Sequence, residues 1–228
     1  MNARTKHIDA ILKNAAAEGI KQIVNLGAGY DSRAYRLRNA VPEVKFFELE
    51  LPATLALKKK LLAEIFGKIP GDVVYVSIDF NTQTLESELK NAGYDPAQKA
   101  LFIWEGVTYY ITEQAVDSTL NFVAQHSAPG SSIVFDYMPR SVVEGDFSKH
   151  PGAKRSAQRV ATKGEPYIFG IKEGEVEHFI NERGLKMLSD LGPGELAKQY
   201  LVRSDGSVDG LASSWFRILH AKVPGSNR

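Results

Sequence analysis

A short apolar run that stops at two glycines constrains this chain more than any other feature. Residues 23–26 are followed by Gly27 and Gly29, one residue apart, and then by a segment compatible with a helix. This pattern is typical of a strand that turns sharply into a helix, where glycine lets the backbone approach a ligand. Glycine pairs also occur in ordinary turns, so the rest of the chain must decide between a bend and a ligand site.

Apolar strand-like runs and amphipathic helix-like segments alternate along most of the sequence. We expect strands at residues 23–26, 44–50, 73–78, 100–104, 131–135, 185–188 and 213–223. We expect helices at residues 4–18, 30–38, 52–66, 82–92, 112–123, 176–180 and 194–201. Such alternation predicts an α/β fold, a doubly wound and mostly parallel seven-stranded Rossmann-like sheet. The last pair of runs suggests one antiparallel strand near the C-terminus.

One segment interrupts this alternation. Residues 138–172 are rich in Gly, Pro, Ser and charged residues, which predicts a long irregular insertion. Long loops beside strand ends are often functional, so we expect a lid or a substrate loop, with a plain surface excursion as the alternative. Apart from this insertion, we expect residues 1–228 to form a single domain.

The helix expected at residues 52–66 carries both apolar and basic residues. Its inward-facing residues are expected to be Leu55, Leu62, Ile65 and Phe66. The three lysines at residues 58–60 are expected to point largely outward and to form a solvated face.

Composition excludes several classes of function. The chain has 28 Lys and Arg against 27 Asp and Glu, so its formal net charge of +1 gives no sign of a nucleic-acid or membrane partner. It has no cysteine, and its five histidines lack zinc-like spacing, so we expect no metal site. No run approaches a membrane span and no signal peptide opens the chain. These features predict a cytoplasmic protein with a small-molecule partner.

Acidic residues follow several of the expected strands. In an open α/β sheet the ligand lies beyond the carboxyl ends of the strands, so these acids should gather on one rim with the glycines. An acid at the end of the second strand can accept hydrogen bonds from both hydroxyls of a ribose. For any single acid, a helix cap or a solvated turn is the simpler reading. The expected rim residues are Gly27, Gly29, Glu48 or Glu50, Asp79, Glu105 and Asp136.

The charge of this rim distinguishes between two nucleoside cofactors. An acidic rim repels a pyrophosphate and attracts a cation, which favours S-adenosylmethionine over NAD. Ser32 also occupies the position of the third glycine in the dinucleotide motif Gly-x-Gly-x-x-Gly.

The chain resembles the leucine carboxyl methyltransferase-like family of class I S-adenosylmethionine-dependent methyltransferases, in particular its bacterial small-molecule O-methyltransferase branch. The resemblance spans nearly the whole chain. It is carried by Arg4-Thr5, by residues 25–37, 47–52 and 104–110, and by Asp79-Phe80.

The resemblance implies a role for each matching residue. Arg4, otherwise a solvated basic residue at a helix start, would hold the methionyl carboxylate of the cofactor. Gly27, Ala28 and Gly29 would bring the backbone close to the methionyl and ribose portions. Glu50 would bind the ribose hydroxyls, with Glu48 behind it. Asp79 and Phe80 would hold the adenine, and Glu105 would bind the ammonium.

The resemblance also implies a reaction, the transfer of a methyl group to a small-molecule carboxylate or hydroxyl. A carboxylate acceptor needs no base, whereas a hydroxyl must be deprotonated or polarised. The candidates for that role are Tyr109, Tyr110, Asp136 and Tyr137, and the alternative for the tyrosines is that they are packing residues with satisfied hydroxyls. His150 and His178 are weaker candidates by position, and His220 is expected to be structural.

Three alternatives and one difference accompany this prediction. The protein could instead be a protein C-terminal carboxyl methyltransferase, a catalytically idle cofactor-binding module, or an interaction protein. Family members usually carry a longer helical segment before the position of Arg4 than the three residues found here. We therefore expect the cofactor to be covered by residues 138–172 or by a partner subunit, as in a homodimer.

Overall fold

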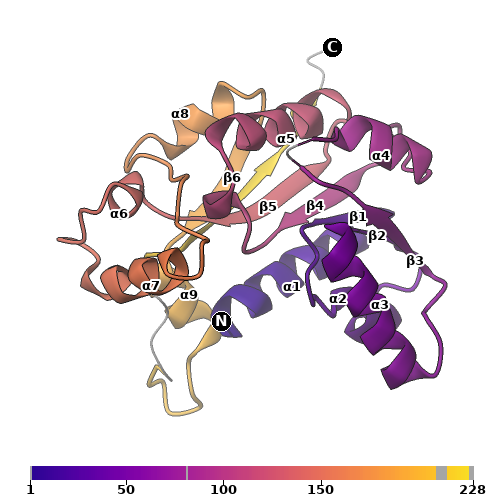
Figure 1. The fold of residues 1–228 in the computed structure, drawn as a ribbon, viewed down its shortest axis with the longest axis horizontal. Coiled ribbons are helices and arrows are strands. Elements are labelled where there is room, and N and C mark those ends of the chain that lie inside the picture. Colours follow the sequence, from indigo (N-terminus) through magenta and orange to yellow (C-terminus); the bar gives the residue numbers. More distant parts are fainter. Residues whose placement is uncertain (1, 81, 209–214, 226–228) are drawn as a thin grey trace.

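A seven-stranded sheet forms the centre of the computed structural model, which describes residues 2–80, 82–208 and 215–225 (Figure 1). The strand order is β3-β2-β1-β4-β5-β7-β6. β7 runs antiparallel to β5 and β6, and the pairs among β1 to β5 are parallel. The expected doubly wound fold is therefore confirmed. The strands are β1 (Gln22–Leu26), β2 (Lys45–Glu50), β3 (Val73–Ser77), β4 (Ala100–Trp104), β5 (Ser132–Tyr137), β6 (Lys186–Leu191) and β7 (Arg217–Lys222).

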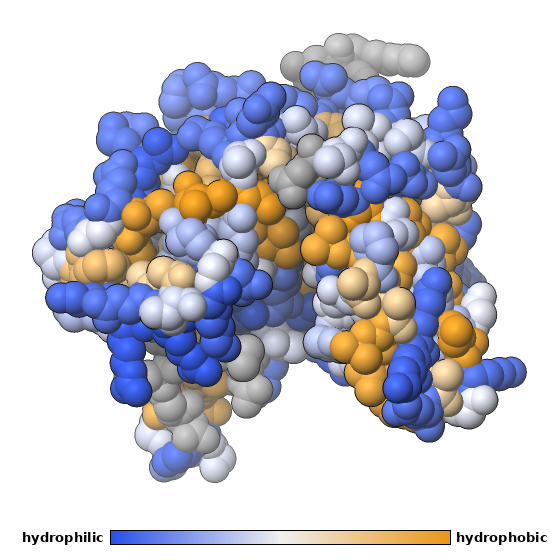
Figure 2. Space-filling view, in the orientation of Figure 1, coloured by the Kyte–Doolittle hydropathy of each residue, from blue (hydrophilic) through white to orange (hydrophobic). Residues whose placement is uncertain are grey.

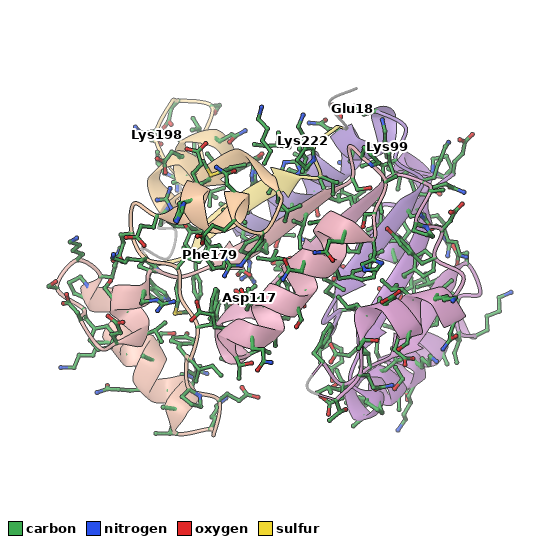
Figure 3. The ribbon with its side chains drawn as sticks, turned by 90° about the horizontal axis from the view of Figure 1, so that it is seen from above. Glu18, Lys99, Asp117, Phe179, Lys198 and Lys222 are labelled. Atoms are coloured by element: carbon green, nitrogen blue, oxygen red, sulfur yellow. The ribbon has the colours of Figure 1, made fainter. Side chains whose placement is uncertain are left out.

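Helices cover both faces of the sheet. On one face lie α1 (Asn2–Ala17), α2 (Arg33–Arg36), α3 (Pro52–Phe66) and α9 (Pro193–Tyr200). On the other lie α4 (Leu85–Asn91), α5 (Glu113–Gln125) and α8 (Val176–Asn181). Figure 3 labels Asp117 on α5 and Phe179 on α8. Arg183, just after α8, contacts both residues. Its Nε donates to Asp117 at 2.8 Å, and its guanidinium lies 3.5 Å from the centre of the Phe179 ring. No helix among the described residues is long and apolar enough to span a membrane.

Two helices are shorter than the sequence predicts. Residues 30–38 contain only α2, followed by a 3₁₀ turn at Arg38–Ala40. The Asp31 carboxylate accepts the backbone N–H of Arg33, so the chain before α2 belongs to the glycine turn rather than to the helix. α4 begins at Leu85 because the Thr84 hydroxyl accepts the backbone N–H of Ser87 and caps the helix there.

The predicted orientation of α3 is wrong at three residues. Leu55 and Leu62 are buried as expected, but Ile65 is 72% exposed and Phe66 is 52% exposed. The end of α3 projects away from the strands in Figure 1, and Figure 2 shows hydrophobic residues over it. Lys58, expected to be solvated, is only 3% exposed. It shares the face of Leu55 and Leu62 by spacing, and Glu48 on β2 provides a carboxylate partner 2.8 Å away.

The insertion at residues 138–172 is not irregular throughout, as the sequence suggested. It contains α6 (Arg140–Val143) and α7 (Pro151–Ala161). Their apolar residues form a separate small cluster with residues of the rim, and this cluster holds the insertion against the body of the fold. Its buried members are Tyr109, Met138, Val142, Ala153 and Tyr167. The last strand, expected at residues 213–223, is β7, and residues 213 and 214 lie outside the described part of the chain.

Candidate functional site

The glycine turn after β1 is held against the end of β2 by hydrogen bonds. Gly27 and Gly29 have φ values of +68° and +42°, in a region of backbone conformation that residues other than glycine rarely adopt. A Cβ on Gly27 would lie 2.5 Å from Cγ2 of Val107, so the backbone approaches the loop after β4 very closely. The N–H of Ala28 donates to the carbonyl of Leu49 at 2.9 Å. The backbone conformation therefore favours glycine at both positions, and at Gly27 there is also no room for a side chain.

Glu50 is fixed at the same place, at the end of β2. Its Oε2 accepts the N–H of Gly29 at 2.6 Å, and its Oε1 accepts the N–H of Leu51 at 2.8 Å. Two backbone donors thus orient a partly exposed carboxylate at the rim of the sheet.

Glu48 lies two residues earlier on the same face of β2, below the rim. Its carboxylate is buried, pairs with Lys58 and accepts the Tyr35 hydroxyl at 2.9 Å. Burial raises the pKa of Glu48, and the ammonium of Lys58 opposes that effect. Of the two acids that could bind a ribose, Glu50 is the one presented at the rim.

Arg4 connects α1 to the ends of β4 and β5. Its Nε lies 2.6 Å from Oε1 of Glu105, and its Nη1 donates to Oδ2 of Asp136. Asp136 is fully buried and also accepts the N–H of Gly106 at 2.7 Å. Burial raises the pKa of Asp136, opposed by Arg4 and by the Gly106 N–H. Glu105 and Asp136, expected at this rim, and Arg4, which the resemblance placed at the cofactor, do lie together.

Arg33 is a member of this site that the sequence analysis did not single out. Its buried guanidinium contacts three carboxylates: Asp31 at 2.5 Å, Glu105 Oε2 at 2.7 Å and Asp9 at 2.8 Å. Glu105 is therefore held between two guanidiniums, one on each oxygen. The available signal was the pair Asp31 and Arg33 inside the glycine-turn motif, because an aspartate capping a short turn can pair with an arginine two residues on.

Asp79 and Phe80 lie after β3, at the same rim. The N–H of Asp79 donates to the side chain of Gln83 at 3.0 Å. Phe80 is among the residues that line a cavity of about 590 Å³ between residues 82–86 and α5, whose polar lining residues are largely uncharged. A cavity of this volume is in the usual range for small-ligand sites.

Three of the four candidates for a general base, Tyr109, Tyr110 and Asp136, lie close together, and Tyr137 lies apart from them. Tyr109 is buried, with its hydroxyl 3.5 Å from Asp136. Tyr110 stacks near Tyr167, their ring centres 5.6 Å apart, and burial raises the pKa of Tyr110 to about 12. Tyr137 points to the opposite face of the sheet from Asp136, where its hydroxyl donates to Asp190 at 3.1 Å.

The groups at this rim match a cationic nucleoside ligand. Glu50 and Glu105 offer carboxylates to hydroxyls or to an ammonium, and Arg4 offers a guanidinium to a carboxylate. The buried Nη2 of Arg33 has no hydrogen bond to any described residue. The described residues contain no cluster of His, Asp or Glu that could hold a metal ion.

A doubly wound sheet with a glycine turn after β1 and acids at the ends of β2 and β4 defines a nucleoside-cofactor-binding domain of the class I methyltransferase type. The sequence model of the family described as leucine carboxyl methyltransferase matches residues 1–124, more than half of the chain. The chain belongs to the leucine carboxyl methyltransferase family.

Individual relatives agree with this assignment. The chain is 31% identical over 194 residues to YktD of Bacillus subtilis (strain 168), named as an S-adenosyl-L-methionine-dependent methyltransferase. That alignment covers 85% of this chain and 63% of YktD. A protein of Streptomyces coelicolor with the same kind of name, SCO7813, is 37% identical over 142 residues, 62% of this chain and 49% of its own length. The chain thus spans about half to two thirds of the length of these relatives.

Solved structures share the fold. One named as a methyltransferase, from Thermobifida fusca YX, matches with a TM-score of 0.69 at 15% identity, covering 98% of this chain and 81% of that one. Together these comparisons confirm the expected family, fold and cofactor, S-adenosylmethionine. The roles expected for single residues stay predictions.

Proposed function

We propose that this protein is an S-adenosylmethionine-dependent O-methyltransferase that methylates a small-molecule carboxylate or hydroxyl. The observation that carries the proposal is the convergence of Arg4, Glu50 and Glu105 around the glycine turn. These groups are complementary to the carboxylate, ribose and ammonium of the cofactor, and the family assignment supports the same cofactor.

Each group has a separate task in binding. Glu50 accepts hydrogen bonds from the ribose hydroxyls, and its own orientation is set by the N–H groups of Gly29 and Leu51. Arg4 binds the methionyl carboxylate while Asp136 holds its guanidinium. Glu105 binds the ammonium, and Arg33 keeps one of its oxygens in place. Phe80 offers an aromatic wall for the adenine, with Asp79 beside it.

The cofactor supplies a methyl group that its sulfonium already activates. The protein's contribution is then to align the acceptor with that methyl group and to exclude water, effects that together reach about 7–11 kcal/mol when orientation is good. The insertion that contains α6 and α7 packs beside the rim and is suited to the exclusion of water. Cover from a partner subunit, as in a homodimer, stays a prediction.

The environment of the tyrosines favours a carboxylate acceptor over a hydroxyl. A general base works best with a pKa near the working pH, and Tyr110, with its pKa raised to about 12, stays protonated at neutral pH. Asp136 is fully buried and already bonded to Arg4 and Gly106. A carboxylate acceptor needs no base, so it fits this set of groups best.

Turnover assays with a panel of small acceptors test the proposal. Purified protein is incubated with S-adenosylmethionine and either small carboxylic acids or phenols, and the acceptor is followed by mass spectrometry. We expect one acceptor class to gain a single methyl group while S-adenosylhomocysteine is released. Cofactor binding without any methylated acceptor across the panel would instead support the idle cofactor-binding module.

A further inference from the structure

Positive charge is concentrated in the insertion, on α7 and the turn that follows it. Residues 147–164 contain five Lys or Arg residues and no Asp or Glu. Because the whole chain carries a formal charge of +1 and this segment carries +5, the remaining residues carry −4. The charge is therefore segregated rather than mixed over the surface.

The two sides of α7 have different surroundings. Ala153, Ala157 and Val160 face the cluster that contains Tyr109 and Tyr167. The opposite side is exposed, and Figure 2 shows hydrophilic residues around this helix. We call this exposed side the basic face of α7, and it consists of Lys154, Arg155 and Arg159 on the helix and Lys163 in the turn after it.

These four cations have no ion pair with any residue of the described chain. Lys149, the fifth cation of the segment, differs because it lies near Asp146 and Glu173 and contributes to the lowering of their pKa values. We therefore leave Lys149 out of the basic face.

The stability of the helix explains only part of the basic face. Lys154 and Arg155 lie near the N-terminus of α7, where positive charge opposes the helix dipole. Arg155, Arg159 and Lys163 follow one another at a spacing of four residues, at which like charges repel. Arg159 lies in the last turn, where positive charge favours the dipole, so helix stability accounts for Arg159 but not for Lys154 and Arg155.

We propose that the basic face of α7 is a docking surface for an acidic segment of another protein. From Lys154 to Lys163 the face extends about 14 Å at 1.5 Å per residue, the length of a short acidic helix or strand. Four exposed cations in this space complement a run of carboxylates.

Two other anionic partners fit less well. A helix that binds a membrane surface buries large apolar residues in the lipid, but the apolar residues of α7 already pack inward. Binding to a nucleic acid uses an extended basic track or exposed aromatic residues for stacking, whereas the rest of this chain is net negative and would repel a long polyanion.

The basic face lies on the outer side of a helix whose inner side packs against the cluster beside the candidate site. The inner side of α7 contacts the cluster of Tyr109, whose hydroxyl lies 3.5 Å from Asp136. An acidic partner would thus sit on the outside of the insertion that packs beside the rim. This inference does not depend on the proposed transfer of a methyl group.

Binding of a defined acidic probe tests the docking surface. The probe is a fluorescent polyglutamate peptide of about 10 residues, which matches the length of the face. One variant carries Lys154→Ser, Arg155→Ser, Arg159→Ser and Lys163→Ser. A matched control removes four exposed lysines elsewhere: Lys13→Ser, Lys60→Ser, Lys68→Ser and Lys99→Ser. Lys99 is labelled in Figure 3, far from α7.

We expect the parent protein to bind the peptide with an affinity that falls as salt is added. The α7 variant should bind about tenfold or more weakly, and the control should stay within about twofold. The inference is overturned if the parent does not bind or if both variants lose affinity equally. It is also overturned if oligothymidylate of equal charge, or vesicles containing phosphatidylglycerol, bind the basic face more tightly than the peptide. Calorimetry of all three proteins with S-adenosylmethionine is a separate readout, so failure of the cofactor site is distinguishable from failure of docking.

Discussion

Arg4 and Glu105 connect the first helix to the end of β4, with Nε of Arg4 2.6 Å from Oε1 of Glu105. Arg33 binds the other oxygen of the same carboxylate at 2.7 Å. The carboxylate expected to bind the cofactor's ammonium is thus oriented by two cations from two helices. Arg4 and Arg33 are in turn held by Asp136 and by Asp31 and Asp9. This network is the structural basis of the predictions for the site.

Asp136→Asn separates a positioning role from that of a general base. The amide keeps the shape of the side chain but removes the charge that holds Arg4, so we expect cofactor affinity to fall about tenfold or more, with turnover at saturating cofactor little changed. Calorimetry and steady-state kinetics measure the two effects. Asp190→Asn, which alters an acid bonded to Tyr137 and Arg217, is the control. Unchanged affinity with lost turnover would show that Asp136 is a base.

Lys58→Met tests the buried ion pair beneath β2. Without Lys58, the Glu48 carboxylate is buried with no cation, so we expect the free energy of unfolding to fall by about 3–5 kcal/mol. Urea unfolding measures this loss. The double variant Lys58→Met with Glu48→Gln should recover part of it, because no uncompensated charge remains. Lys60→Met, on the exposed side of α3, should change stability by less than about 0.5 kcal/mol. Equal effects of Lys58→Met and Lys60→Met would contradict the pairing.

Gly27→Ala and Gly67→Ala form a matched pair. Both glycines have a positive φ, +68° and +74°, so either substitution should cost about 1–2 kcal/mol from backbone conformation. Only at Gly27 does the new Cβ meet another group, Val107 at 2.5 Å, whereas Gly67 faces open space. We expect Gly27→Ala to be less stable than Gly67→Ala and to bind the cofactor more weakly. Thermal unfolding and calorimetry check both, and equal losses would show that the close approach is unimportant.

The sequence predicted the strands more accurately than the helices. Strands such as β4 are continuous apolar runs, and such a run in the sequence directly indicates a strand that is buried on both faces. α3 was oriented wrongly because its lysines were treated as solvated, whereas Lys58 has a carboxylate partner on a strand that is distant in sequence. α6 and α7 were missed because Gly, Pro and Ser around them obscure the helical pattern of a short, polar segment.

The candidate site was predicted in its acids and, through the family resemblance, in Arg4, but not in Arg33. Glu50, Glu105 and Asp136 could be placed because the carboxyl ends of parallel strands meet at one rim. Arg33 was missed because its three partners come from α1, the glycine turn and the end of β4, which only the fold brings together. Tyr137 was grouped with Asp136 by sequence, although consecutive residues of a strand point to opposite faces.

His220 should make the fold sensitive to acid. Burial, and to a lesser extent His7, lower the pKa of this strand residue to about 4. Because the folded-state pKa lies below the unfolded value of about 6.5, stability is retained above pH 6.5 and is lost as pH falls toward 4. Between pH 7 and pH 5 we expect a loss of about 2 kcal/mol from this group. Urea unfolding at both pH values should show a smaller loss for His220→Gln, and an equal loss would contradict a buried neutral imidazole.

Calorimetric titration with S-adenosylmethionine tests the central claim most directly. We expect the parent protein to bind, and Arg4→Ala and Glu50→Ala each to weaken binding by about 10- to 100-fold, the effect of losing a charge-assisted hydrogen bond. Arg38→Ala removes an exposed arginine paired with Asp72, away from the site, and should bind like the parent. Binding of NAD in place of S-adenosylmethionine, or equal affinity in all four proteins, would contradict the assignment of this rim to the cofactor.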